Sequence, residues 1–358
     1  MYSYKFNFFH LIRIVSLSLN NFYKCFRSKY LKYDMENRNK IRWGIIGLGN
    51  IANQFATDLK LIEDAKLNAV ASRNTDKASE FALKHNCATF YGSYEELFAD
   101  DQIDIVYIAT PHDSHAELSI KAMQNGKHVL CEKPLSLSYS DTVRMIETSN
   151  KYNKFFMEAF WTRFIPSIKE LLSKVKDGEI GEVKYINADF AFINRELGTR
   201  LTDKKLGGGA LYDIGVYPLF LSYILLGIPK DIIAKSIYHT TGVDLQTTMI
   251  LQYESAQAVL HAGLVSASDM KATISGTSGR IDIDSPWFMT EGYSVFVNEQ
   301  EEKFHIPNIG KGYSYEAIEC HQCIRQNQIE SKLWSHHNSL DLSKITEDVR
   351  KQINVEFS

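Results

Sequence analysis

The chain has 358 residues, of which 44% are hydrophobic and 23% are charged, and its formal net charge is −3. This balance is typical of a folded globular protein of about two domains and excludes a disordered or collagen-like chain. The small negative charge provides no bulk attraction for nucleic acid or an anionic membrane, and we expect neither as a partner. Five cysteines are too few for a disulfide framework, so we expect free thiols and a cytoplasmic protein.

The first 40 residues differ in composition from the rest. They contain eight Lys or Arg against two Asp or Glu, and a histidine and an arginine interrupt the apolar stretch from Phe6 to Leu19. That stretch is shorter than the ~18 apolar residues that span a bilayer, and it lacks the cleavage site of a signal peptide. We expect residues 1–40 to be a disordered extension, or residues 1–34 to precede a true start at Met35. A membrane-surface or targeting helix is the alternative.

A glycine motif follows the first predicted strand. Residues 41–46 are an apolar run, and the next six residues match Gly-x-Gly-x-x-Ala, the dinucleotide-binding fingerprint. Gly47 permits a tight turn, Gly49 lets the backbone approach a pyrophosphate, and Ala52 lets the following helix pack closely. The N-terminus of that helix would face the phosphates. The cofactor-binding candidates of this motif are Gly47, Gly49, Asn50, Ile51 and Ala52.

The end of the second predicted strand, 67–71, indicates which dinucleotide is bound. A cofactor without a 2′-phosphate usually calls for Asp or Glu there, whereas this chain has Ser72, Arg73 and, one turn later, Lys77. A hydroxyl and two cations suit a 2′-phosphate, and an arginine can also lie on the adenine face. The sequence therefore favours NADP over NAD. An ordinary surface arginine at a helix start is the alternative.

Further strands alternate with helices in the first half of the chain. Apolar runs at 103–109, 128–131 and 155–158, with a helix at 114–125 between the first two, predict an α/β fold. We expect a doubly wound parallel Rossmann sheet over residues 41–160, with its ligand beyond the carboxyl ends of the strands. The residues at these ends are Thr110, Pro111, His112, Glu132 and Lys133.

The second half has a different pattern. A helix at 166–176 is followed by strand-like runs with few helices between them, which predicts an open, largely antiparallel sheet. We therefore expect residues 161–358 to form an α+β domain. The runs lie at 183–192, 232–239, 247–253, 258–264, 271–276, 280–283 and 293–297.

Several motifs together resemble a known family. Cys-Glu-Lys-Pro at 131–134, combined with the glycine fingerprint, resembles the glucose–fructose oxidoreductase/inositol dehydrogenase (Gfo/Idh/MocA) family over about residues 41–355. Residues 157–164, 208–217 and 241–244 are similar to its branch of dimeric dihydrodiol dehydrogenases and NADP-dependent D-xylose 1-dehydrogenases. Many members end the Asp-x-x-x-His motif with histidine, whereas this chain has Tyr217. That difference argues against an inositol dehydrogenase proper.

The resemblance implies a reaction and a set of catalytic residues. The expected reaction is oxidation of a sugar hemiacetal or cyclic diol by hydride transfer to NADP, with D-xylose to its lactone as the first candidate and trans-dihydrodiols as further substrates. A phenol with a pKa of about 10 is a poor base at neutral pH. A nearby ammonium lowers that pKa, so we expect Tyr217 to act as the base beside Lys133, with Asp213 orienting the substrate. A homodimer through the C-terminal sheet is also implied.

Other candidates carry competing interpretations. Trp161, Arg163 and Trp287 are predicted to bind substrate, although Arg163 would equally anchor the site and Trp287 would equally belong to a dimer interface. Tyr217 itself would, by spacing alone, equally be a core aromatic residue.

Two pairs have metal-like spacing. His112 and His115 form His-x-x-His without a third ligand, so no metal is expected, and His112 is predicted to lie beside the nicotinamide. Cys320 and Cys323 are predicted to be buried free thiols in a helix at 315–326.

Two other functions use the same fold. A non-catalytic dinucleotide sensor has no need for Lys133, Asp213 and Tyr217 together. A glycoside hydrolase that works through a tightly held NAD is disfavoured by Ser72 and Arg73.

Overall fold

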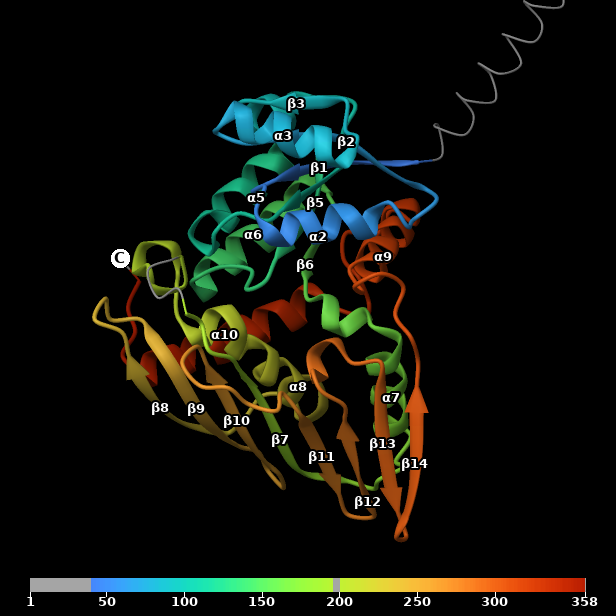
Figure 1. The fold of residues 1–358 in the computed structure, drawn as a ribbon, viewed down its shortest axis with the longest axis vertical. Coiled ribbons are helices and arrows are strands. Elements are labelled where there is room, and N and C mark those ends of the chain that lie inside the picture. The colour runs from blue at the N-terminus through green and yellow to red at the C-terminus, as the bar shows by residue number, and fades with distance from the viewer. Residues whose placement is uncertain (1–39, 196–199, 358) are drawn as a thin grey trace, which may run out of the picture.

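The computed structural model describes residues 40–195 and 200–357, so the predicted N-terminal extension lies, apart from its last residue, outside the described residues. Two sheets organise the chain (Figure 1). The first has six strands in the order β3-β2-β1-β4-β5-β6, all parallel. The strands are β1 (Ile41–Ile46), β2 (Ala65–Ala71), β3 (Thr89–Tyr91), β4 (Ile105–Ile108), β5 (His128–Glu132) and β6 (Phe156–Ala159). This confirms the predicted doubly wound parallel sheet.

Helices cover both faces of the parallel sheet, and three of them begin at a side-chain cap. The side chain of Asn74 accepts the Lys77 N–H at the start of α3, and Ser93 with Glu96 forms a capping box at the start of α4. The helices are α2 (Asn50–Leu59), α3 (Thr75–His85), α4 (Tyr94–Ala99), α5 (His115–Gln124) and α6 (Tyr139–Tyr152). The strand order reverses between β1 and β4, and this reversal opens a crevice at their carboxyl ends.

The second sheet has eight strands in the order β14-β13-β12-β11-β7-β10-β9-β8. Every neighbouring pair is antiparallel except β7 and β10, which confirms a mostly antiparallel sheet. The strands are β7 (Val183–Ala191), β8 (Asp231–Tyr238), β9 (Asp244–Gln252), β10 (Gln257–Gly263), β11 (Ala272–Gly276), β12 (Gly279–Ile283), β13 (Gly292–Val297) and β14 (Gln300–His305). Apolar patterning missed β14 because its residues are mostly charged and exposed.

One face of this sheet is covered by helices and the other is open (Figure 1). The covering helices include α8 (Val216–Leu226), which lies against β7 and β10, and α10 (His336–Gln352), which packs on α8 and β8. Two further helices are α7 (Pro166–Lys176) and α9 (Ser314–Arg325). In the described part of the chain, one helical stretch, Lys204–Leu226, is long and apolar enough to cross a membrane, and 78% of its most apolar window is buried in the protein.

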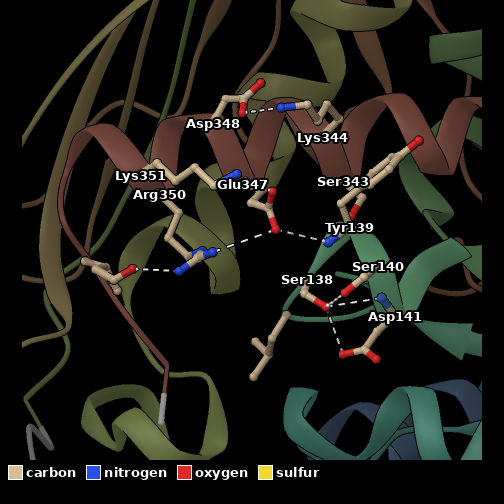
Figure 2. A network of polar contacts seen from close by, with 12 residues as sticks. Ser138, Tyr139, Ser140, Asp141, Ser343, Lys344, Glu347, Asp348, Arg350 and Lys351 are labelled. Atoms are coloured by element: carbon tan, nitrogen blue, oxygen red, sulfur yellow. Dashed lines mark hydrogen bonds and ion pairs between the residues drawn. The ribbon is translucent and has the colours of Figure 1, made fainter. Parts of the chain in front are cut away.

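The two sheets are joined by the C-terminal helices. α10 also packs against α6, and α9 packs against α2. Figure 2 shows the polar part of the first contact: Glu347 accepts the backbone N–H of Tyr139 at 3.3 Å and pairs with Arg350 at 3.8 Å. Buried apolar side chains of both sheets form one continuous core. A domain boundary near residue 160 therefore remains a prediction.

Candidate active site

A cleft of about 880 Å³ lies at the carboxyl ends of β1, β2, β4 and β5 and extends to the second sheet. Its wall combines a glycine turn, a basic end and an aromatic end. The lining residues from the parallel-sheet half are Gly47, Leu48, Gly49, Asn50, Ile51, Gln54, Ser72, Arg73, Asn74, Lys77, Tyr94, Ala109, Thr110, Pro111, His112, Glu132 and Lys133. Those from the second half are Trp161, Phe190, Phe192, Arg200, Asp213, Ile214, Tyr217, Phe288 and Tyr313.

The glycine turn is shaped to receive a pyrophosphate. Gly47 has φ +78°, and a Cβ there would lie 2.4 Å from the backbone of Ala109, so only glycine fits. A Cβ on Gly49 would meet no described atom closer than 3.9 Å, and its backbone borders the open cleft. No side chain caps the N-terminus of α2, which leaves its first N–H groups for an anion. Ala52 is fully buried and acts in packing.

The basic end lies where β2 meets α3. Ser72, Arg73 and Lys77 line it as predicted, together with Asn74 and Tyr94, which the sequence did not single out. Burial raises the pKa of Tyr94, and the positive charge of Arg73 works against it. Among the described residues, no Asp or Glu lines this end of the cleft. The residues present therefore fit a phosphorylated ribose better than a free one.

The two histidines of the His-x-x-His motif have different surroundings. His112 lines the cleft, its Nδ1 lies 3.1 Å from the Gly207 carbonyl, and burial lowers its pKa to about 3, so it is neutral. His115 lies behind the wall, with its two ring nitrogens each 2.9 Å from a backbone carbonyl, of Thr110 and of Pro134. It joins the loops after β4 and β5. Within the described residues, no three His, Cys, Asp or Glu side chains gather as metal ligands.

Lys133 occupies the centre of the cleft. Its Nζ donates to the backbone carbonyl of Asp213 at 2.5 Å and lies 4.7 Å from the centre of the Tyr217 ring. Burial lowers the pKa of Lys133, and the carboxylates of Asp213 and Glu132 work in the opposite direction. Glu132 accepts from the hydroxyl of Tyr107 and from the backbone N–H of Lys133. The ammonium is therefore held by groups from both halves of the chain.

Asp213 is paired with a residue that the sequence did not reveal. Its Oδ1 accepts from Arg200 Nη2 at 2.7 Å. Burial opposes ionisation, but the charges of Arg200 and Lys133 outweigh it and hold the pKa of Asp213 below its usual value. Arg200 precedes the glycine run at 207–209 without any motif of its own, so no local signal identifies it.

The surroundings of Tyr217 differ from the expectation. Its Oη accepts from Trp161 Nε1 at 2.9 Å, and the rings of Phe160, Phe190 and Phe288 lie 5.4 Å from its own. Burial raises the pKa of Tyr217 well above its ordinary value. The predicted lowering by Lys133 is not seen, because the ammonium faces the ring and not the hydroxyl.

Two predicted substrate residues lie elsewhere. Trp287 is fully buried and donates to the Asp189 carbonyl at 2.8 Å, so it walls neither the cleft nor an exposed interface. Arg163 Nε donates to the Leu333 carbonyl at 3.0 Å and does not line the cleft, which leaves its anchoring role. Trp161 does line it. The cysteines in the described residues, including Cys320 and Cys323, are buried and free, as predicted.

An aromatic wall completes the site. Phe190 and Phe288 stack with ring centres 3.9 Å apart and an interplanar angle of 9°, and Phe192 lines the same part of the cleft. These phenylalanines come from β7, from the residue after it and from the turn Trp287–Met289. Sequence reasoning missed them, because an isolated phenylalanine in a strand is indistinguishable from a core residue. The wall gives this part of the cleft an apolar lining.

Comparison with known proteins agrees with this geometry. The sequence profile of an oxidoreductase family with an NAD-binding Rossmann fold matches residues 41–160, and that of the GFO/IDH/MocA C-terminal domain matches residues 168–282. A trans-1,2-dihydrobenzene-1,2-diol dehydrogenase of Xenopus tropicalis is 38% identical over 330 residues, covering 88% of this chain and 99% of the relative. A scyllo-inositol 2-dehydrogenase (NADP(+)) of Bacillus subtilis is 36% identical over 324 residues, covering 88% and 98%.

Solved structures show the same architecture. A 3-ketoreductase from Actinomadura kijaniata in complex with NADP and TDP-benzene superposes with a TM-score of 0.81 at 25% identity, covering 88% of this chain and 98% of that one. An aldose-aldose oxidoreductase from Caulobacter crescentus has a TM-score of 0.80 at 22% identity, with the same coverage.

The fold, the glycine turn and the cleft define an NAD(P)-dependent oxidoreductase that acts on CH–OH groups. The chain belongs to the Gfo/Idh/MocA family, which confirms the resemblance seen in its motifs.

Proposed function

We propose that this protein oxidises a secondary alcohol or hemiacetal of a cyclic diol or sugar, with NADP as the preferred cofactor. The observation that carries the proposal is the convergence of Lys133, Asp213 and Tyr217 at the end of a cleft whose other end is a dinucleotide turn. When bound, the nicotinamide dinucleotide accepts the hydride. The chain's own residues must bind the alcohol, orient it and take its proton.

Tyr217 is the proposed base. Tyr217 lines the cleft, and as a phenolate it would take the proton of the substrate hydroxyl while the hydride leaves the carbon that carries that hydroxyl. The Lys133 ammonium, which donates to the Asp213 carbonyl in this structure, would polarise the substrate oxygen. Asp213, kept ionised by Arg200, would accept a hydrogen bond from a neighbouring substrate hydroxyl.

The shape of the site favours a ring with hydroxyls along one edge. The stacked Phe190 and Phe288 present a flat apolar surface, whereas Asp213 and Lys133 lie on the polar side. A cyclic diol or pyranose has such a two-sided character. The dihydrodiol and scyllo-inositol dehydrogenase relatives support this class. D-xylose, oxidised to its lactone, remains the first sugar to test.

Two further properties belong to the proposal. The basic end at Arg73 and Lys77, without a described carboxylate, supports NADP over NAD. The outer face of the second sheet exposes Tyr185, Ile233 and Ile250, apolar side chains that a second copy would cover. We therefore propose a homodimer through this face and, given the buried free thiols, a cytoplasmic location.

The direct experiment follows reduced-nicotinamide absorbance with purified protein, NADP or NAD, and a panel of cyclic trans-diols, inositols and aldoses. We expect turnover of at least one cyclic diol or pyranose with NADP preferred. In Tyr217→Phe, turnover should fall by 10²-fold or more, the order lost when a general base is removed, while NADP binding measured by calorimetry is retained.

Other outcomes identify the rival functions. Tight dinucleotide binding without turnover of any alcohol would indicate a sensor. Cleavage of nitrophenyl glycosides with a copurifying cofactor that is not consumed would indicate the hydrolase. A fully active Tyr217→Phe would reject the assignment of the base.

A further inference from the structure

Trp161 contacts the proposed base directly. It begins the turn Trp161–Phe164 that follows β6, and its indole is 4% exposed. The indole N–H donates to Tyr217 Oη at 2.9 Å, between residues 56 positions apart in the chain. An indole nitrogen is a donor only and does not titrate at accessible pH. The direction of this hydrogen bond is therefore fixed: the tyrosine oxygen accepts.

The charged and titratable groups around Tyr217 do not stabilise a negative charge on its oxygen by a hydrogen bond. The Lys133 ammonium, at the end of β5, donates to Asp213 and faces the ring. Glu132 from β5, Asp213 from the turn before α8 and Tyr313 before α9 all disfavour a negative charge on Tyr217, and Trp161 is the hydrogen-bond partner that favours it. Arg200 is bound to Asp213.

We infer that Trp161 is a positioning residue that fixes the Tyr217 hydroxyl and stabilises its deprotonated form through the indole N–H. This inference rests on the proposed role of Tyr217 as base. In the reaction, the O–H bond of the substrate breaks and a new O–H bond forms on Tyr217, while the indole keeps its own proton. Because the indole fills one acceptor direction of the phenolic oxygen, the transferred proton must arrive from another side.

The indole is itself held in place from the dinucleotide-binding half. The ring of Tyr313 stacks on Trp161 with centres 4.6 Å apart at 29°. Asp58, near the end of α2, accepts the backbone N–H groups of Lys311 at 2.9 Å and Tyr313 at 3.0 Å. The helix that begins at the glycine turn thus determines, through Tyr313, where the Trp161 N–H lies.

The test is the pH dependence of kcat in Trp161→Phe, which keeps an aromatic ring in the wall and removes the donor. We expect the ascending limb of the profile to move up by about one pH unit, the effect of losing one hydrogen bond to the charged form. At the foot of that limb kcat would be about tenfold lower, converging with the wild type at high pH. KM should change by less than threefold, because the wall remains apolar.

The matched control is Trp43→Phe. Trp43 is also a buried indole that donates to a side chain, His321 at 2.9 Å, but it lies in β1 outside the cleft. Its removal should lower thermal stability and leave the pH profile unchanged. A profile that stays unchanged in Trp161→Phe as well would overturn the inference.

Two further variants keep the outcomes separate. If Trp161→Phe does not fold, as judged by circular dichroism, Asp58→Ala frees the indole by releasing the backbone of Tyr313, its stacking partner. It should shift the limb in the same direction, and no shift would count against the inference. If Tyr217→Phe retains turnover, the proposed base is wrong; if it is inactive and Trp161→Phe has the wild-type profile, only the role of Trp161 is wrong.

Discussion

Each buried charge of the site lies beside groups that stabilise it. Asp213 is held ionised by Arg200, and Lys133 is held by a backbone carbonyl and two nearby carboxylates, although burial favours the neutral form of both groups. Such mutual compensation is the condition under which charged groups remain buried. The Tyr217 oxygen accepts from a neutral donor, the indole N–H of Trp161. A bound substrate oxygen would therefore meet the tyrosine and the lysine from different directions.

At the same scale, Arg73 should decide the choice between cofactors. Arg73→Ala removes a cation that suits a 2′-phosphate, and a hydrogen bond to a charged group contributes about 1.5–3 kcal/mol. We expect KM for NADP to rise roughly 10- to 100-fold while KM for NAD changes little, as measured in parallel steady-state assays. Lys84→Ala, on α3, the helix that follows Arg73, but outside the cleft, serves as the control. An equal effect on both cofactors would show that Arg73 does not contact the phosphate.

At the scale of elements, the loop between β5 and α6 carries Lys133 and is held by three buried side chains. The Pro134 carbonyl lies 2.9 Å from a ring nitrogen of His115, the Leu135 N–H donates to Glu158, and the Leu137 carbonyl accepts from Tyr212. These partners come from α5, β6 and the turn before α8. The position of the lysine is thus determined by elements on both sides of the cleft.

Glu158 is the residue of this set whose loss should be most costly. Its carboxylate accepts from the Leu135 N–H at 3.1 Å, Trp334 Nε1 at 3.1 Å and Ser339 Oγ at 2.7 Å. Glu158→Ala would leave these buried donors unpaired, so we expect a loss of about 3–5 kcal/mol in the free energy of unfolding, measured by urea denaturation.

A second readout separates position from stability. Below the melting transition, Glu158→Ala should lower kcat more than it raises KM for NADP, since the loop carries Lys133 and not the glycine turn. The control is Glu147→Ala. Glu147 lies on α6 and its side chain is exposed, so this substitution should change neither the stability nor kcat. Wild-type stability in Glu158→Ala would contradict the role of Glu158 in holding this loop.

At the scale of the whole molecule, the eight-stranded sheet is covered on one face only (Figure 1). Its open face carries exposed apolar side chains, and we propose that a second copy covers them. Ile250→Glu, in β9, places a charge within that face and should convert a particle of twice the chain mass into a monomer in light scattering coupled to size exclusion. Leu83→Glu, at an 82% exposed position on α3, should leave the mass unchanged. A wild-type protein that is already monomeric would reject the dimer.

The sequence by itself determined the features that are encoded locally. The glycine turn at Gly47, the strand periodicity and the polar residues at strand ends such as Lys133 follow from backbone sterics and from the alternation of elements, so a short window is sufficient to detect them. The family motifs also identified Asp213 and Tyr217 as candidate site residues, and both line the cleft.

Only the tertiary structure decided which distant side chains meet. The pairing of Arg200 with Asp213, the hydrogen bond from Trp161 to Tyr217 and the stacking of Phe190 on Phe288 join residues from separate elements. The same packing places Trp287 in the core and not in the cleft. Its ring is fully buried there, and its indole N–H donates to the Asp189 carbonyl. Residue type specifies what a side chain is able to do, whereas burial and neighbours, which depend on the whole fold, decide what it does.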